Sequence, residues 1–295
     1  HQPMKKTKIF IGPSNVANIS YTFMKAFRSI GIKTDFYTYL SRDSGFNYEG
    51  GYVIKLYESE IRIFNKKIVL ITGHTGFKGS WLSVWLSHLG AKVIGVSDRV
   101  PTEPSHYELI KNNLNYDLQI NLKDAKSIYE FLDEAQQDFI FHLAAQPIVL
   151  DSYLDPLNTF NTNVMGTANL MDALRRVNHK CTVVIITSDK CYDNNESQKP
   201  HSENDPMGGN DPYSASKGAA EIVTSAYRNS FFNKNFNHST AIATIRAGNV
   251  IGGGDWDTDR IIPDCIRQLV AKKPIKLRYP NAIRPKKFVL EPIFG

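Results

Sequence analysis

Two short stretches of the sequence contain side chains that could carry out chemistry on a hydroxyl group. Positions 187–190 read Thr-Ser-Asp-Lys, and Tyr213 stands four positions before Lys217. A hydroxyl, a carboxylate and an amine side by side, then a tyrosine and a lysine one helical turn apart, could together oxidise a sugar hydroxyl. The same groups could remove a proton beside the new ketone and expel water. These stretches are therefore the candidate active site.

The elements that must position these residues follow a regular order from Lys67 onward. Short apolar runs alternate with amphipathic stretches, which predicts a parallel sheet with helices on both faces. Strands are expected at 67–71, 91–97, 139–143, 183–187 and 241–245, and helices at about 82–89, 128–135, 156–177 and 212–231. The predicted fold class is α/β, a Rossmann-type doubly wound parallel sheet, over residues 67–245.

The first 66 residues stand apart from this series. Two strand-like runs, at 8–11 and 33–39, flank a helical pattern, so residues 1–66 are predicted to form a short, separate βαβ-like segment. The segment weakly resembles the opening unit of a two-domain glycosyltransferase, with residues 12–15 as its loop. The alternative, which we favour, is an appended segment without activity.

A glycine-rich turn follows the first strand of the main series. Gly73, Gly76 and Gly79 form the spacing GxxGxxG between an apolar strand and an amphipathic helix. Glycines permit a tight turn and close backbone approach, and a helix N-terminus attracts a pyrophosphate, so this placement favours a dinucleotide site over an ordinary glycine turn. Asp98, about 20 residues further on, could bind an adenosine ribose and favour NAD over NADP, although the adjacent Arg99 could accept a 2′-phosphate.

The spacing Tyr-x-x-x-Lys carries little weight by itself. It occurs three times, at Tyr21/Lys25, Tyr107/Lys111 and Tyr213/Lys217. Only the third pair follows a late strand of the series at the head of a helix, and we interpret the other two as surface helix. On one helix face, Lys217 could lower the pKa of Tyr213 and hold the nicotinamide ribose, while Tyr213 takes a hydroxyl proton as hydride leaves.

Composition narrows the class of protein further. The net charge of +6 is compatible with a solvated surface or with binding of anions such as diphosphates. No dense basic run with interleaved aromatic residues indicates nucleic acid, and no apolar run approaches the ~20 residues of a membrane span. The three cysteines, Cys181, Cys191 and Cys265, show no metal-ligand spacing and are typical of a reduced, cytoplasmic protein.

Long motifs in residues 67–295 resemble the extended short-chain dehydrogenases/reductases of the nucleotide-sugar dehydratase and epimerase group. The matching runs are GHTGFKGSWLSVWL from Gly73, FHLAAQPIV from Phe141, NVMGT from Asn163, TSDKCY from Thr187, ENDPMGGNDPYSASKGAAE from Glu203, RAGNVIGGGDW from Arg246, DRIIPD from Asp259 and RP followed by VLEP from Arg284. A lysine at position 190 makes the sequence more similar to the branch that acts on CDP-glucose, because the dTDP- and GDP-sugar branches are expected to carry Glu at this position.

The resemblance implies a lyase reaction, a dehydration that belongs to deoxysugar biosynthesis such as that of O-antigens. Tyr213, aided by Lys217 and Ser188, would assist oxidation of the C4 hydroxyl by NAD+. Lys190 would remove the C5 proton, and Asp189, if held protonated, would act as acid on the departing C6 hydroxyl. Return of the hydride to C6 would give CDP-4-keto-6-deoxyglucose without consuming NAD.

The resemblance also implies binding residues and a partner. The residues expected around the cofactor are Gly73, Thr75, Gly76, Phe77, Gly79, Asp98, Asn121, Leu143, Ala144 and Ala145. Those expected around the nucleotide-sugar substrate are Gln146, Asn249, Arg260 and Arg284, most of which suit an anion as hydrogen-bond donors. A homodimer is expected through the helices at 156–177 and 212–231.

Three features depart from the family pattern. Asn121 replaces the acidic residue after the third strand, and Lys286-Lys287-Phe288 replaces an aromatic-polar-His run. The sequence stops at Gly295, so residues 246–295 are expected to form an incomplete nucleotide-sugar-binding lobe with exposed apolar surface. Two alternatives therefore stand beside the dehydratase: a nucleotide-sugar 4-epimerase, which needs no C5 or C6 chemistry, and a degenerate nucleotide-sugar-binding protein without turnover.

Overall fold

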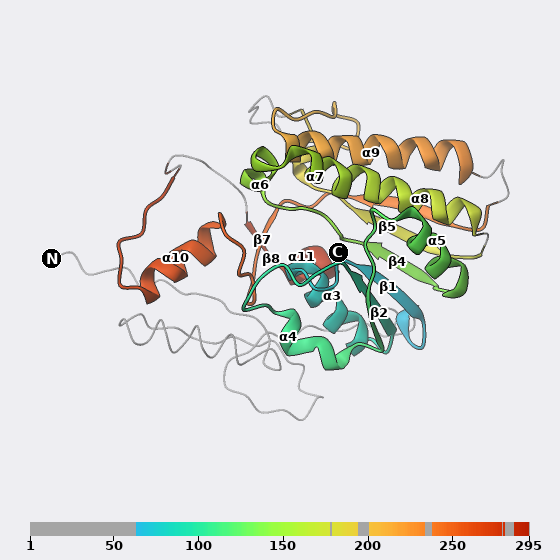
Figure 1. Ribbon diagram of the computed structural model, residues 1–295, viewed down its shortest axis with the longest axis horizontal. Coiled ribbons are helices and arrows are strands. Elements are labelled where there is room, and N and C mark those ends of the chain that lie inside the picture. Colours follow the sequence, from blue (N-terminus) through green and yellow to red (C-terminus); the bar gives the residue numbers. More distant parts are fainter. Residues whose placement is uncertain are drawn as a thin grey trace.

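A six-stranded parallel sheet forms the centre of the protein (Figure 1). The computed structural model describes residues 63–177, 179–193, 201–233, 238–278, 280 and 286–294. The strand order is β3-β2-β1-β4-β5-β6: β2 and β3 are added on one side of β1, and β4, β5 and β6 on the other, as in a doubly wound Rossmann sheet. The strands are β1 (Ile68–Thr72), β2 (Lys92–Ser97), β3 (Tyr116–Gln119), β4 (Phe139–His142), β5 (Thr182–Ile186) and β6 (Ala241–Ile245). The predicted fold class is confirmed.

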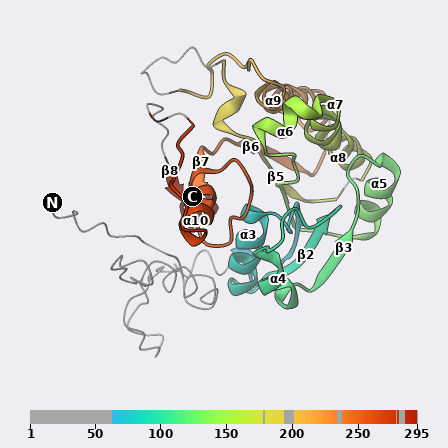
Figure 2. The same cartoon turned by 60° about the vertical axis from the view of Figure 1, so that its left-hand side comes forward.

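Helices cover both faces of the sheet, and Figure 2 shows α8 and α9 beside each other on one of them. The longer helices are α3 (Phe77–His88), α5 (Ala125–Glu134), α8 (Gly166–Arg176), α9 (Pro212–Phe231) and α10 (Ile261–Val270). The short ones are α4 (Tyr107–Ile110), α6 (Val149–Leu154), α7 (Pro156–Phe160) and α11 (Leu290–Phe294). The βαβ-like segment predicted for residues 1–66 falls, up to residue 62, outside the described residues.

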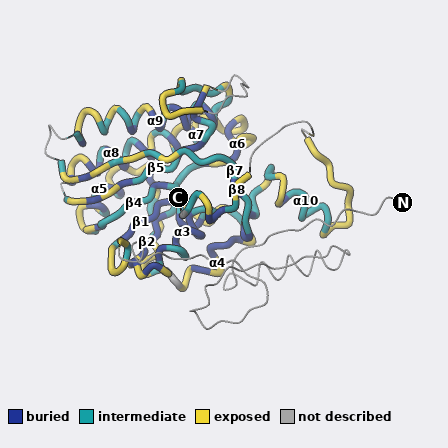
Figure 3. The backbone as a smooth tube through the Cα atoms, turned by 180° about the vertical axis from the view of Figure 1, so that it is seen from behind, coloured by how far each residue is buried: buried dark blue, intermediate teal, exposed yellow. Residues whose placement is uncertain are grey.

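Alternation along β1 explains how two layers of helices attach to one sheet. Val69 and Ile71 belong to an apolar cluster that includes residues of α3. Leu70 points to the opposite face and belongs to the cluster that contains residues of α5 and α8. Because all three side chains are completely buried, both faces of the central strand are covered, as expected for a parallel sheet. Figure 3 shows this buried centre.

Two differences from the sequence-based expectations have physical reasons. The single helix expected at 156–177 is divided into α7 and α8 by one turn of π-helix, Asn161–Met165. The strand β3 has no apolar signal of its own, because it lies at the edge of the sheet and only Leu118 of its four residues is half-buried. The strand itself therefore could not be read from hydrophobic periodicity.

The last part of the described chain packs against α3. β7 (Asn249–Ile251) and β8 (Lys286–Phe288) form a small parallel sheet. Trp81 on α3 contacts this unit through an apolar cluster with Val250 and Val289, and its indole N–H donates to the carbonyl of Gly253 at 2.9 Å. Figure 1 shows α10 apart from the large sheet, and among the described helices none is long and apolar enough to cross a membrane.

A buried histidine joins β1 and β4 to the helical layer. His142 Nδ1 lies 2.8 Å from Thr72 Oγ1, and its Nε2 lies 3.0 Å from Thr167 Oγ1. The Thr167 hydroxyl donates to the carbonyl of Asn163, so it accepts from an Nε2–H, and Nδ1 is left to accept from Thr72. The neutral ring is therefore fully paired. Burial, with a smaller contribution from Lys217, lowers the pKa of His142 to about 3.

The depressed pKa of His142 predicts a loss of stability in mild acid. An unfolded histidine titrates near ~6.5, so between that pH and about 3 the unfolded state binds the extra proton, and the contribution of His142 is complete only above ~6.5. From pH 7 to pH 5 this histidine should remove about 2 kcal/mol from the free energy of unfolding. Urea unfolding of the wild type and of His142→Gln at both pH values measures the difference.

His88 supplies the control for this measurement, because it lies exposed in the last turn of α3. His88→Gln should keep the pH dependence of the wild type, whereas His142→Gln should be less sensitive to pH. Parallel pH curves for the wild type and His142→Gln would show that His142 does not resist protonation in the folded protein.

Candidate active site

The glycine-rich turn between β1 and α3 lies directly against the chain that follows β4. Gly73 has a φ of +74°, and a Cβ built there would lie 2.6 Å from the backbone nitrogen of Ala144. At Gly79 a Cβ would lie 2.8 Å from the Cα of His74. The N-cap residue of α3, Gly76, has no side chain to cap the helix. The first N–H groups of α3 can therefore bind an anion.

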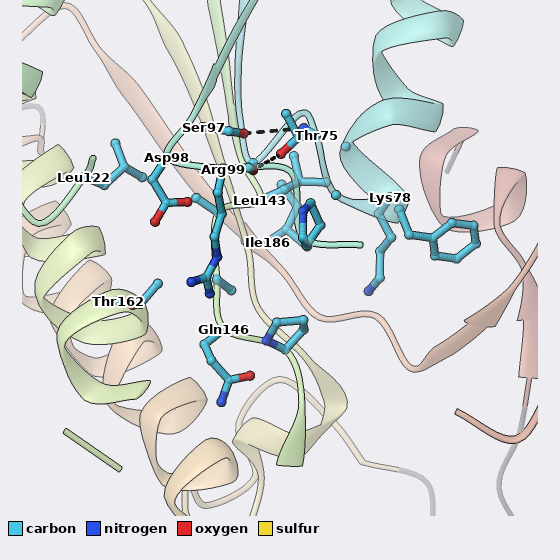
Figure 4. Close-up of a pocket in the computed structure, with 18 of the residues that line it drawn as sticks. Thr75, Lys78, Ser97, Asp98, Arg99, Leu122, Leu143, Gln146, Thr162 and Ile186 are labelled. Carbon is cyan, nitrogen blue, oxygen red and sulfur yellow. Dashed lines mark hydrogen bonds between the residues drawn. The ribbon is translucent and has the colours of Figure 1, made fainter. Parts of the chain in front are cut away.

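A cavity of about 200 Å³ opens above this turn, at the carboxyl ends of the parallel strands (Figure 4). All ten residues expected around the cofactor line it: Gly73, Thr75, Gly76, Phe77, Gly79, Asp98, Asn121, Leu143, Ala144 and Ala145. Tyr213, Lys217, Gln146 and Arg260 also line it. Asn249 is not among the described residues that line the cavity, and Arg284 lies outside the described residues.

A histidine within the turn fixes its position, and sequence reasoning missed it. The His74 side chain is completely buried, with Nδ1 3.0 Å from Ser97 Oγ and Nε2 2.9 Å from Asp117 Oδ1. Thr75 adds a hydrogen bond from its hydroxyl to the carbonyl of Arg99, at 2.7 Å (Figure 4). These contacts attach the turn to β2 and β3. The sequence shows a histidine between two glycines, but its partner Asp117 lies 43 positions further on, so the contact could not be predicted.

The end of β2 presents an acidic and a basic side chain to the same cavity. Asp98 and Arg99 both line it, and Figure 4 shows the Arg99 guanidinium reaching inward. A carboxylate here can accept from a ribose hydroxyl, whereas a guanidinium can pair with a phosphate. Both the carboxylate that would favour NAD and the guanidinium that could accept the 2′-phosphate of NADP therefore face the cavity.

Tyr213 and Lys217 lie in the first turns of α9, where Asp211 caps the helix by accepting from the N–H of Ser214 at 2.9 Å. Burial raises the pKa of Tyr213, while a hydrogen bond with Ser188 and the charge of Arg260 act in the opposite direction. The lowering that we expected from Lys217 is not found. The Lys217 amine lies 5.9 Å from the centre of the Tyr213 ring.

The pKa of Lys217 itself is depressed. The side chain is only 6% exposed, and burial, reinforced by repulsion from Lys78, lowers its pKa to about 8. Cys191 and Glu221 partly oppose this shift. A lysine that loses its proton near neutral pH can pass protons as well as hold a ribose by hydrogen bonds.

The run 188–190 forms a short turn directly after β5. The Ser188 hydroxyl donates to Asp189 Oδ1 at 2.9 Å and accepts from the backbone N–H of Lys190 at 3.2 Å. The structure thus brings Ser188 to both Asp189 and Tyr213. Asp189 and Lys190 are half-buried. None of Ser188, Asp189 and Lys190 is among the described residues that line the cavity, which reaches Thr187 on this strand.

A buried ion pair between α9 and the chain after β6 supports this turn, and no sequence pattern indicated it. Glu221 on α9 accepts from the Thr187 hydroxyl at 2.5 Å and from Arg246 at 3.0 Å. Arg246, after β6, also donates to the hydroxyl of Tyr192 at 3.0 Å. Burial would raise the pKa of Glu221, but these bonds outweigh it and hold the pKa low. The end of β5 is therefore tied to the helix that carries Tyr213.

The predicted substrate residues differ in whether their polar groups are already bonded to other residues of the protein. The Gln146 amide is engaged internally, donating to the carbonyl of Ile148 at 3.0 Å and to Thr159 Oγ1 at 2.9 Å. Arg260 faces the cavity but lies 3.1 Å from a carboxylate oxygen of Asp257 and 3.6 Å from one of Asp255. Gln146 thus shapes the wall, whereas Arg260 is a charged group that two carboxylates hold at the cavity.

The sheet order, the glycine turn and the tyrosine–lysine helix together define an extended short-chain dehydrogenase/reductase. The model of the family described as GDP-mannose 4,6 dehydratase matches residues 70–280, and the chain belongs to that family.

Three known proteins show how far this similarity extends. CDP-glucose 4,6-dehydratase of Salmonella typhimurium is 49% identical over 232 residues, which cover 78% of this chain and 65% of that relative, less than two thirds of its length. The structure of Pal from Bacillus thuringiensis has a TM-score of 0.68 at 23% identity, covering 77% of this chain and 71% of that one. MoeE5 in complex with UDP-glucose and NAD has a TM-score of 0.63 at 25% identity, covering 76% and 69%.

The packing of the turn predicts that Gly79→Ala weakens dinucleotide binding. The added methyl group would meet the backbone of Gly73 and His74, so the turn must open and the helix N-terminus must move. We expect the dissociation constant for NAD+, measured by calorimetric titration, to rise at least about 10-fold, which corresponds to ~1.4 kcal/mol.

Gly166→Ala, at the start of α8, is the matched control, because the nearest atom to its added Cβ is 3.6 Å away. This variant should bind NAD+ as the wild type does and should be slightly more stable, since alanine favours a helix. Equal NAD+ affinity in Gly79→Ala and the wild type would mean that the turn does not hold the dinucleotide.

Proposed function

We propose that this chain catalyses, with NAD, the dehydration of CDP-glucose to CDP-4-keto-6-deoxyglucose. The observation that carries the proposal is the 49% identity to a CDP-glucose 4,6-dehydratase over 78% of the chain. Tyr213 in the cavity wall, with Ser188 beside it, supports the same chemistry. Epimerisation at C4 is not favoured, because it requires neither Asp189 nor Lys190.

NAD fits the cavity on the chemistry of its walls. The free amides at the start of α3 suit a pyrophosphate, and the Asp98 carboxylate suits the hydroxyls of an adenosine ribose. A related structure, MoeE5, is described with NAD bound. Leu143, Ala144 and Ala145 provide the apolar part of the wall at the end of β4. We therefore infer NAD as the resident cofactor, with Arg99 as the group that could admit a 2′-phosphate.

The first step assigned to the residues is proton removal from the C4 hydroxyl. When bound, NAD+ supplies a hydride acceptor, and its positive ring favours the ionised form of a nearby phenol. Tyr213 takes the hydroxyl proton, and Ser188, which lies close enough to affect the pKa of Tyr213, helps to orient the phenol. Lys217, with a pKa of about 8, can accept or return a proton at this position.

The elimination is assigned to the pair that follows Ser188. A ketone at C4 acidifies the C5 proton, which the Lys190 amine removes as base. Asp189 supplies a proton to the C6 hydroxyl as it departs as water. The Ser188 hydroxyl, 2.9 Å from Asp189 Oδ1, connects this acid to the oxidation site. The two halves of the reaction therefore share one serine.

Three further expectations accompany this function. Residues 246–295 would hold the nucleotide sugar, with Arg260 as the charged contact. A homodimer would cover the apolar side chains that α6 to α9 expose, among them Leu154 at 84%, Leu157 at 75% and Ile222 at 60%; a monomeric mass in sedimentation would contradict it. A cytosolic location agrees with the three free cysteines.

Incubation of the protein with CDP-glucose and NAD+ tests the proposal. We expect a 4-keto-6-deoxy sugar nucleotide, identified by mass spectrometry, with CDP-glucose converted faster than dTDP-glucose or GDP-mannose. Lys190→Ala should lose at least ~100-fold in turnover, because the C5 base is removed, and should still bind NAD+. Lys180→Ala on the described surface is the control and should react at the wild-type rate.

Two outcomes would contradict this account. Absence of product from all three sugar nucleotides, with NAD+ bound, would leave a nucleotide-sugar-binding protein without turnover. A wild-type rate in Lys190→Ala would remove Lys190 from the mechanism while leaving the reaction itself intact.

A further inference from the structure

A second lysine enters the cavity from the glycine turn, and the proposed reaction assigns it no role. Lys78 is the second residue of α3 and lines the same cavity as Tyr213, Lys217 and Arg260. Figure 4 shows its side chain extending from the start of the helix into the cavity, with the amine at the tip. Its position within the turn places a full positive charge where the helix already offers backbone N–H groups.

The charges around the cavity are unbalanced. The cationic side chains that line it are Lys78, Arg99, Lys123, Lys217 and Arg260, and the acidic ones are Asp98 and Asp257. Arg260 is paired with Asp257 at 3.1 Å, and Lys123 donates to Asn158 Oδ1 at 3.1 Å. Lys78 is attracted by Asp189 and Asp255 only at longer range, and no described carboxylate pairs directly with it. The cavity is thus prepared for ligands that bring negative charge.

The surroundings of Lys78 disfavour its charged form when no anion is bound beside it. Burial, followed by repulsion from Arg260, lowers its pKa, and the two distant carboxylates only partly compensate. The same charge helps to depress the pKa of Lys217. A phosphate oxygen beside Lys78 would remove both penalties and would also accept from the uncapped amides of α3.

We propose that Lys78 binds a diphosphate group in this cavity and supplies the charge that backbone amides alone do not carry. The inference rests on the proposed function, because two diphosphates would then meet here, that of the dinucleotide and that of the nucleotide sugar. Both present the same oxygens to an ammonium group. Lys78 therefore acts in binding and adds one specific contact to the glycine turn.

Separate titrations of NAD+ and of CDP test this inference and distinguish the two sources. The variants are Lys78→Met, which keeps the length of the side chain without its charge, and Lys78→Arg, which keeps the charge. We expect Lys78→Met to weaken one of the two ligands at least about 10-fold, with a smaller dependence of its binding on salt, and Lys78→Arg to stay within ~3-fold. The ligand that weakens identifies which diphosphate Lys78 binds.

Lys126→Met provides the control, because Lys126 lies on the surface of α5 with 81% of its side chain exposed. It should bind both ligands as the wild type does, and thermal unfolding should show that Lys78→Met remains folded. If Lys78→Met binds both NAD+ and CDP within twofold of the wild type, the inference is overturned. Binding that depends on Lys78 in a protein without turnover would instead overturn the proposed function alone.

Discussion

The close approach of the glycine turn to the chain after β4 is the constraint on which the site depends. A side chain at Gly73 would collide with Ala144, so the two backbones can touch only because that position has none. This contact closes the floor of the cavity and aims the start of α3 at its interior. The amides of α3, the Lys78 amine and the wall formed by Leu143 to Ala145 all take their places from it.

A continuous series of polar contacts connects this turn to α9, the helix that carries Tyr213. It runs from the N–H of Ala144 through Thr72, His142, Thr167, Asn163 and Ser216 to the carbonyl of Tyr213. Each internal member of the series is buried, so each bond must be made for the fold to be stable. The floor of the cavity and the tyrosine are thereby held in a fixed relation, which hydride and proton transfer at one carbon requires.

Helices and strands that are marked by a local sequence pattern were predicted correctly, whereas contacts between residues far apart in the chain were not predicted. The bounds of α9 and β6 agree with the structure because periodicity and flanking residues mark them. The edge strand β3, the His74–Asp117 contact and the Glu221–Arg246 pair carried no such signal, since their partners lie elsewhere in the chain. The raised pKa of Tyr213 likewise follows from burial, which spacing to a lysine cannot indicate.

Transfer of label within one sugar tests the central claim, that a single cavity oxidises C4 and returns the same hydride after loss of water. CDP-glucose with deuterium at C4 would be converted in ordinary water, and the product would be examined by mass spectrometry and proton NMR. The account predicts deuterium at C6 of the 4-keto-6-deoxy product. A product without deuterium, or a C4 epimer formed without loss of water, would contradict it.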